Sequence, residues 1–134
     1  MSNERADPRV KVMVVDDEAI VADCLAAMLT DAGYDVTTFN NPKLALAELA
    51  REPEAWALVV TDQRMPGMNG DVLAKAMRER RPDLPIVLSS GYGEDTSAAR
   101  MRALGVDAFI PKPYDIDAAV ETVRAVIEAR RGSG

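Results

Sequence analysis

The sequence predicts an α/β fold in which a doubly wound, five-stranded parallel sheet carries helices on both faces. Two patterns alternate along the chain: short, β-branched apolar runs, and longer segments whose apolar residues recur at helical spacing. Strands that are apolar along their whole length are typical of a parallel sheet buried on both faces. Strict alternation with short loops favours this arrangement, because each helix then crosses back over the sheet.

Each element has its own local justification. The first strand, Val10–Asp16, is nearly continuous in apolar residues and leads into a helix over Glu18–Ala32, after which Gly33 stands where a C-cap belongs. Asn41 followed by Pro42 predicts the start of a helix that runs to about residue 51, because an Asn N-cap and a proline in the first turn are both preferred there. The remaining predicted strands are 35–39, 57–62, 85–89 and 108–110, and the remaining helices cover 72–81, about 96–104 and a segment capped by Asp115.

One domain accounts for almost the whole chain of 134 residues, because a chain of this size can bury a single hydrophobic core. We expect a polar leader at 1–9, a domain over 10–130 and a short tail at 131–134. The leader lacks the apolar segment of a signal peptide, and no apolar run approaches the ~20 residues of a membrane span. We therefore expect a cytoplasmic protein with no membrane partner.

Composition excludes several classes of function. With 16 Lys and Arg against 22 Asp and Glu, the net charge is −6 at pH 7, which argues against direct binding of nucleic acid. The chain contains no histidine, so it can hold neither a Ser-His-Asp triad nor a His-ligated zinc ion, and it cannot donate a phosphoryl group from a phosphohistidine. Its single cysteine, Cys24, cannot form a disulfide within the chain, which is consistent with a reducing compartment.

Polar and charged side chains stand where four of the predicted strands end. They are Asp16 and Asp17 at the end of the first strand, Asp62 at the end of the third, Ser89 and Ser90 at the end of the fourth, and Lys112 at the end of the fifth. The carboxyl ends of parallel strands meet at one edge of a sheet, which is where such folds bind ligands. Carboxylates placed close together repel one another unless a cation compensates, and hard oxygen ligands beside solvent suit Mg²⁺. Lys112 would supply a positive charge for a phosphate group.

Four motifs stand in order along the chain: Val-Val-Asp-Asp-Glu at 14–18, Thr-Asp-Gln-Arg-Met-Pro-Gly-Met-Asn-Gly at 61–70, Leu-Ser-Ser-Gly-Tyr at 88–92, and Pro-Lys-Pro-Tyr at 111–114. With these motifs the chain resembles the receiver domain of two-component response regulators. The resemblance extends from Val10 to about Arg130, which is nearly the whole chain. It implies the flavodoxin-like strand order 2-1-3-4-5.

The resemblance implies a role for each acidic residue at the sheet edge. Asp62, three residues before Met-Pro, matches the aspartate that accepts the phosphoryl group. Asp17 matches a direct Mg²⁺ ligand, and Asp16 a ligand that binds directly or through water. Asp62 itself and the backbone carbonyl of Arg64 would complete the protein ligands, with Mn²⁺ as a possible substitute for Mg²⁺.

Other residues match groups that handle or report the phosphoryl group. Ser90 corresponds to the switch hydroxyl that bonds the phosphoryl group, and Lys112 to the lysine that pairs first with Asp62 and then with the phosphate. The resemblance also implies a cis peptide bond between Lys112 and Pro113. Phe109 corresponds to an aromatic side chain that changes rotamer. Arg64 and Tyr92 flank the path of a hydrolytic water, so we expect them to lengthen the lifetime of the phosphate.

The function that this resemblance implies is that of a signalling phosphoprotein in a phosphorelay, not of an enzyme acting on a foreign substrate. Such a domain catalyses only its own phosphorylation and dephosphorylation, and its phosphodonor is a histidine kinase or a histidine phosphotransfer protein. Phosphorylation would switch the face formed by the fourth helix, fifth strand and fifth helix, which meets a downstream protein partner and is also the site of a possible homodimer. The sequence leaves open whether the domain stands alone or belongs to a hybrid histidine kinase or a longer regulator.

Two functions of other classes compete with this one. A Mg²⁺-dependent phosphohydrolase with an aspartate nucleophile would have an Asp-x-Asp pair after the first strand, whereas Asp16 and Asp17 are adjacent and no cap insertion is present. A flavodoxin-like electron carrier would have a Ser/Thr/Gly-rich phosphate loop after that strand, where this chain has Asp-Asp-Glu.

Overall fold

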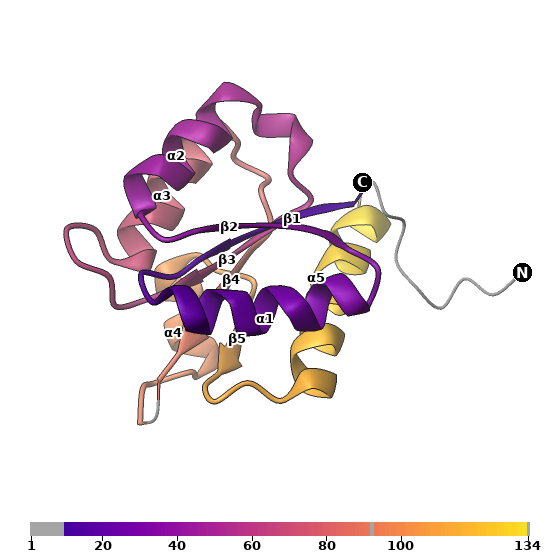
Figure 1. The fold of residues 1–134 in the computed structure, drawn as a ribbon. Coiled ribbons are helices and arrows are strands. Elements are labelled where there is room, and N and C mark those ends of the chain that lie inside the picture. Colours follow the sequence, from indigo (N-terminus) through magenta and orange to yellow (C-terminus); the bar gives the residue numbers. More distant parts are fainter. Residues whose placement is uncertain (1–9, 92, 134) are drawn as a thin grey trace, which may run out of the picture.

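The computed structural model describes residues 10–91 and 93–133, and within them it contains five strands, five α-helices and one short 3₁₀ helix (Figure 1). None of the helices in this part of the chain is long and apolar enough to cross a membrane. The strands are β1 (Lys11–Val15), β2 (Asp35–Phe39), β3 (Leu58–Asp62), β4 (Ile86–Ser90) and β5 (Ala108–Pro111). The helices are α1 (Ala19–Asp31), α2 (Pro42–Arg51), η1 (Pro53–Ala55), α3 (Gly70–Arg80), α4 (Ala98–Leu104) and α5 (Ile116–Ser133).

The five strands form one parallel sheet in the order β2-β1-β3-β4-β5. This confirms the predicted fold class and the strand order that the resemblance implies. The register pairs Val15 of β1 with Thr61 of β3, and Asp62 with Ser89 of β4. The carboxyl ends of these three strands therefore lie together at one edge of the sheet.

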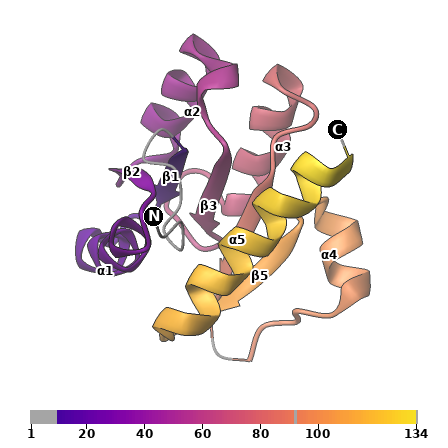
Figure 2. The same ribbon diagram turned by 90° about the vertical axis from the view of Figure 1, so that its right-hand side faces the viewer.

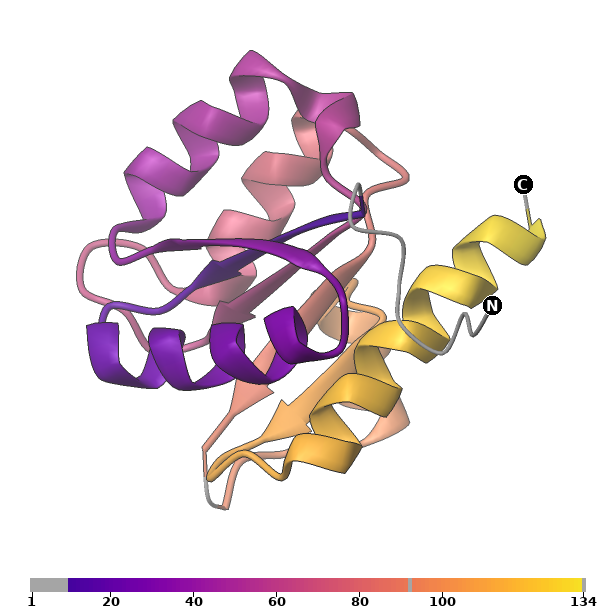
Figure 3. The same ribbon diagram turned by 45° about the vertical axis from the view of Figure 1, so that its right-hand side comes forward.

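Two hydrophobic cores fill the spaces between the sheet and its helix layers. On one face, Leu25 of α1 and Val123 of α5 pack against the strands. Figure 3 shows these two helices on the same face of the sheet. On the other face, the fully buried Leu49 of α2 and Met77 of α3 do so. α4 lies on this second side and contributes only half-buried side chains, and Figure 2 shows α4 and α5 flanking β5.

The boundaries of the elements differ slightly from those predicted. β4 runs to Ser90 rather than to residue 89, and η1 was not predicted. α3 begins at Gly70 rather than at residue 72, because the backbone there packs directly on β3. A Cβ atom added at Gly70 would lie 2.2 Å from the carbonyl oxygen of Asp62, so any other residue would push α3 away from the strand.

A network of charged side chains connects three elements at the amino edge of the sheet, the edge at which the strands begin. The carboxylate of Asp107, just before β5, accepts hydrogen bonds from Arg78 of α3 at 2.9 Å, from Arg130 of α5 at 2.8 Å and from the amide of Ile86 at 2.8 Å. The anchoring of Arg130 holds the end of α5 on the domain. α5 itself runs to Ser133.

Candidate functional site

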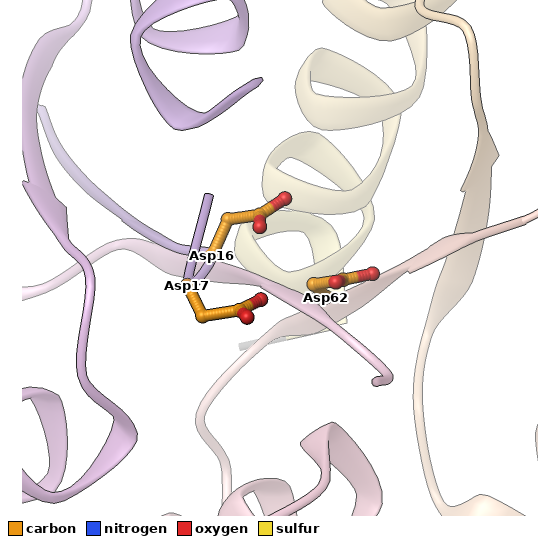
Figure 4. Close-up of side chains that lie close together, drawn as sticks. All are labelled: Asp16, Asp17 and Asp62. Carbon is orange, nitrogen blue, oxygen red and sulfur yellow. The ribbon is translucent and has the colours of Figure 1, made fainter. Parts of the chain in front are cut away.

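Three carboxylates meet at the carboxyl edge of the sheet. Figure 4 shows Asp16 and Asp17, which follow β1, beside Asp62 at the end of β3. Each residue offers a carboxylate oxygen, and these oxygens lie within 4.8 Å of one another. Asp16 and Asp62 are only 1% and 8% exposed, whereas Asp17 is exposed. The cluster is thus a largely buried acidic group with one open side.

Backbone amides orient the two buried carboxylates. The amide of Glu18 donates to Asp16 Oδ1 at 2.9 Å, and the amide of Gln63 donates to Asp62 Oδ1 at 3.0 Å. The backbone of Asp16 is itself held by β2, because its amide donates to the carbonyl of Phe39 at 3.0 Å. Hydrogen bonds of this kind satisfy carboxylate oxygens that burial removes from water.

Lys112 is the cation that the structure brings to this cluster. Its Nζ lies 3.1 Å from Asp16 Oδ2 and 3.2 Å from Asp62 Oδ1. Its backbone amide donates to the carbonyl of Ser90 at 2.8 Å, which ties the start of the β5–α5 loop to β4. The peptide bond between Lys112 and Pro113 is cis, as the resemblance implies.

The charges at this edge do not balance. Burial raises the pKa of the Asp62 carboxyl, and the neighbouring charge of Asp16 raises it further, while Lys112 acts in the opposite direction. Burial acts to lower the pKa of Lys112, but its hydrogen bond to Asp16 and the charges of both aspartates outweigh burial, so the pKa is raised. One ammonium group among three carboxylates leaves a negative site of hard oxygen ligands, which fits a divalent cation such as Mg²⁺.

Ser90 and Phe109 occupy the neighbouring strands as the sequence predicts. Ser90 ends β4 and is 1% exposed, one residue beyond the partner of Asp62 in the sheet register. Phe109 on β5 pairs with Leu88 in the register and is half-buried against the core on the α2–α3 side. The two residues therefore belong to adjacent strands, with Ser90 at the carboxyl end of β4 beside the strand of Asp62.

Arg64 and Tyr92 are the two residues expected to affect the lifetime of the phosphate. The side chain of Arg64 is 82% exposed, and its Nε lies 3.4 Å from Glu94 Oε2 in the β4–α4 loop. Arg64 and Glu94 also line a cavity beside the site, between the β3–α3 and β4–α4 loops. Tyr92 lies outside the described residues.

Two contacts at this site were not predicted from the sequence. One is the ion pair between Arg64 and Glu94. The other is formed by Gln63, whose side chain accepts from the amide of Asp71 at 2.9 Å and donates to the Asp71 carboxylate at 3.2 Å. Gln63 thereby joins the end of β3 to the first turn of α3. A polar residue directly after Asp62 and an acidic one in the next helical turn are the only sequence signals of this link.

Comparison with known proteins identifies the family. The profile described as "Response regulator receiver domain" matches residues 12–124. The chain belongs to this family. It is 37% identical over 117 residues to the DNA-binding transcriptional regulator NtrC of Salmonella typhimurium, and 32% identical over 116 residues to the transcriptional regulatory protein FixJ of Bradyrhizobium diazoefficiens. Both alignments cover 87% of this chain, but only 24% of NtrC and 56% of FixJ. The receiver domain thus spans about a quarter of the length of NtrC.

Solved structures agree with this assignment. The receiver domain of NtrX from Brucella abortus has a TM-score of 0.79 at 30% identity, and the match covers 87% of this chain and 98% of that one. A receiver domain protein from Clostridium thermocellum, with a TM-score of 0.85 at 19% identity, shares the fold. The chain is a receiver domain of two-component systems, and the comparisons give no support to the phosphohydrolase alternative.

The electrostatic imbalance predicts that Asp62→Asn stabilises the apo domain at neutral pH. The folded-state pKa of Asp62 is raised above its ordinary value of 3.8, so its contribution to stability is full below that value and is lost as pH rises through the folded-state pKa. In EDTA at pH 7 we expect the variant to melt several degrees above wild type, since about 1 kcal/mol corresponds to roughly 4 °C in a domain of this size. The advantage should shrink towards pH 4.

Millimolar Mg²⁺ should reduce or reverse this difference, because a cation that binds the folded state stabilises it, and the wild type keeps all three carboxylates. Thermal melts followed by circular dichroism measure both effects. Asp23→Asn, at an exposed position of α1, is the matched control and should change neither. An Asp62→Asn variant less stable than wild type in EDTA at pH 7 would contradict the prediction.

Proposed function

We propose that this receiver domain accepts a phosphoryl group on Asp62 from a phosphohistidine. The observation that carries the proposal is the 3.2 Å contact between Asp62 Oδ1 and Lys112 Nζ, at an edge that holds two further carboxylates. This places a nucleophilic oxygen beside a fixed positive charge. The 134 residues contain no histidine, so the donor histidine belongs to another protein or domain, namely a histidine kinase or a histidine phosphotransfer protein.

The transfer needs no general base, because an ionised carboxylate is already a nucleophile. The bond from Asp62 oxygen to phosphorus forms as the bond from phosphorus to the imidazole nitrogen breaks, and the imidazole leaves with that electron pair. Lys112 would neutralise charge on a phosphoryl oxygen, and the Ser90 hydroxyl would donate a hydrogen bond to another. The domain would catalyse only this transfer and the later hydrolysis of its own aspartyl phosphate.

The metal ligands in this proposal are Asp16, Asp17, Asp62 and the backbone carbonyl of Arg64. The mutual distances of the three carboxylates and their excess negative charge support a divalent ion, Mg²⁺ or Mn²⁺. Bound there, the ion would supply positive charge that offsets the charge of the phosphoryl oxygens.

The apolar surface around the site supports docking of a protein phosphodonor. Ile20, Leu44 and Val72 are 85%, 62% and 53% exposed, and each lies in the first turn of α1, α2 or α3. Those first turns follow β1, β2 and β3 in the chain, so the three helix starts lie at the same edge of the sheet as the acidic cluster. Exposed apolar side chains beside a polar site are typical of protein interaction surfaces. We place the domain and this donor in the cytoplasm.

The proposed output is a change on the face formed by α4, β5 and α5. Ser90 would move towards the phosphoryl group and Phe109 would turn into the space that opens, shifting a two-state equilibrium. The light packing of α4, which buries no residue fully, supports this choice of mobile element. A downstream protein partner, or a second copy of the domain, would bind the altered face.

Phosphorylation of Asp62 is tested with acetyl phosphate and Mg²⁺. Wild type should gain one phosphate by intact-protein mass spectrometry, whereas Asp62→Asn should be labelled at least about 100-fold more slowly, because an amide is a poor nucleophile. Asp23→Asn should be labelled like wild type. Equal labelling of wild type and Asp62→Asn would overturn the assignment of the acceptor.

The docking surface is tested with a phosphohistidine protein that phosphorylates wild type. Ile20→Ser should slow transfer from this protein by roughly fivefold, the effect of losing about 1 kcal/mol of binding to the transition state. Transfer from acetyl phosphate should be unchanged, because the small donor does not need the apolar surface. Ala27→Ser, further along α1, is the control. Equal slowing with both donors would show that Ile20 serves the chemistry or the fold instead.

The switch is tested by NMR with beryllofluoride, a mimic of the phosphoryl group. In the presence of Mg²⁺ we expect the backbone amide signals of Phe109 and of α4 to shift, while that of Leu29 in the α1–α5 core stays in place. Shifts confined to the immediate surroundings of Asp62 would exclude the proposed role of Phe109.

We propose that Arg64 slows hydrolysis of the aspartyl phosphate, and this predicts opposite effects on the hydrolysis rate for substitutions of Arg64 and of its ion-pair partner Glu94. Arg64→Asn should hydrolyse its aspartyl phosphate about two- to tenfold faster than wild type, because the large side chain no longer obstructs water or pairs with a phosphate oxygen. Glu94→Gln should slow hydrolysis, because it releases Arg64 from its ion pair. Tyr92→Glu should accelerate hydrolysis. Decay of the phosphorylated proteins is followed by mass spectrometry, and an Arg64→Asn variant as long-lived as wild type would refute the role of Arg64.

A further inference from the structure

A hydrogen bond between two hydroxyl groups lies next to the phosphorylation site. Ser89 Oγ and Tyr114 Oη are 2.7 Å apart. Ser89 is only 1% exposed, and Tyr114 is half-buried against the core on the α1–α5 side. Neither residue carries a role in the chemistry described above.

The register of the sheet places this pair on the same side as the charged cluster. Ser89 is the direct partner of Asp62 on β3 and of Ile110 on β5, and register partners in a sheet direct their side chains to the same face. Burial raises the pKa of the Tyr114 hydroxyl, its bond to Ser89 lowers it, and Lys112, Asp16 and Asp62 also act on it. The phenol therefore lies between the hydrophobic core and the charged groups.

The bond ties the segment that carries Lys112 to β4 at a second point. The first point is the amide of Lys112, which donates to the carbonyl of Ser90 at 2.8 Å. The second is the Tyr114 hydroxyl, two residues further on, at Ser89. The turn that contains Lys112 is thus held at both ends by two successive residues of the strand beside Asp62.

We propose that Tyr114, through its hydrogen bond to Ser89, is a positioning residue for Lys112 in phosphoryl transfer to Asp62. The inference rests on the proposed function. A phenylalanine would fill the same space in the core but would leave the buried Ser89 hydroxyl without its partner. A hydrogen bond is directional whereas apolar packing is not, so the bond between Ser89 and Tyr114 fixes the position of Tyr114 relative to β4 more closely than packing alone would.

The experiment measures phosphorylation by acetyl phosphate in Mg²⁺ as a function of donor concentration. Tyr114→Phe and Ser89→Ala should each lower the maximal rate constant roughly three- to tenfold, with little change in the donor concentration that gives half the maximal rate. The double variant should be no slower than the slower single variant, because both changes remove one bond. Rates are corrected for the folded fraction, measured by circular dichroism.

Tyr34→Phe is the matched control. Tyr34 belongs to the same hydrophobic core as Tyr114 but lies just before β2, at the amino edge of the sheet. The same chemical change there should leave the corrected rate constant unchanged. A purely structural role of Tyr114 would give both variants the same corrected rate constant as wild type.

The inference is overturned if Tyr114→Phe, corrected for folding, reacts at the wild-type rate, or if the effects of Tyr114→Phe and Ser89→Ala multiply in the double variant. Both results are read against a wild type that takes up phosphate. A wild type that takes up none would overturn the proposed function itself, so the two failures are distinguishable.

Discussion

Repulsion among three carboxylates is the constraint on which the carboxyl edge of this sheet depends. Asp16 and Asp62 are withdrawn from water, and burying a carboxylate is costly unless other groups compensate for the lost hydration. The compensation comes from Lys112, which contacts both, and from the backbone amides of Glu18 and Gln63. Because this compensation is incomplete, carboxylate oxygens with an excess of negative charge remain together at this edge, an arrangement that fits a divalent cation.

The rest of the fold holds these groups at fixed distances. Parallel pairing brings the ends of β1, β3 and β4 to the same level, and the absence of a side chain at Gly70 lets α3 start against the backbone of Asp62. At the opposite edge, Asp107 joins α3, β4 and α5 through partly buried hydrogen bonds. The elements are therefore cross-linked at both edges of the sheet, by Asp107 at one and by the contacts of Lys112 at the other.

The path from the acidic cluster to the surface is short. Lys112 follows β5 directly, and β5 is flanked by α4 and α5 (Figure 2). A group that drew Lys112 or Ser90 towards Asp62 would therefore act on the ends of β4 and β5, next to α4, in which no residue is fully buried. Coupling between the acidic cluster and this surface would cross only one strand. It would require no long chain of contacts, only two side-chain arrangements of similar energy around β4 and β5.

The fold class, the order of the elements and the residues that end the strands could be predicted from the sequence alone. Asp16, Asp62, Ser90 and Lys112 could be predicted as neighbours because buried parallel strands are recognisable from their apolar runs, and their ends must meet. The strand order and the cis bond before Pro113 came from the resemblance to receiver domains, not from periodicity.

Contacts between loops and side chains of different elements could not be predicted from the sequence. The pair of Arg64 and Glu94 joins residues 30 positions apart, and the bond of Ser89 and Tyr114 joins residues 25 positions apart. The start of α3 at Gly70 depends likewise on a backbone contact with β3. Apolar periodicity reports which face of a local element is buried, whereas these contacts depend on how closely whole helices and strands approach one another, and that distance is set by the packed core.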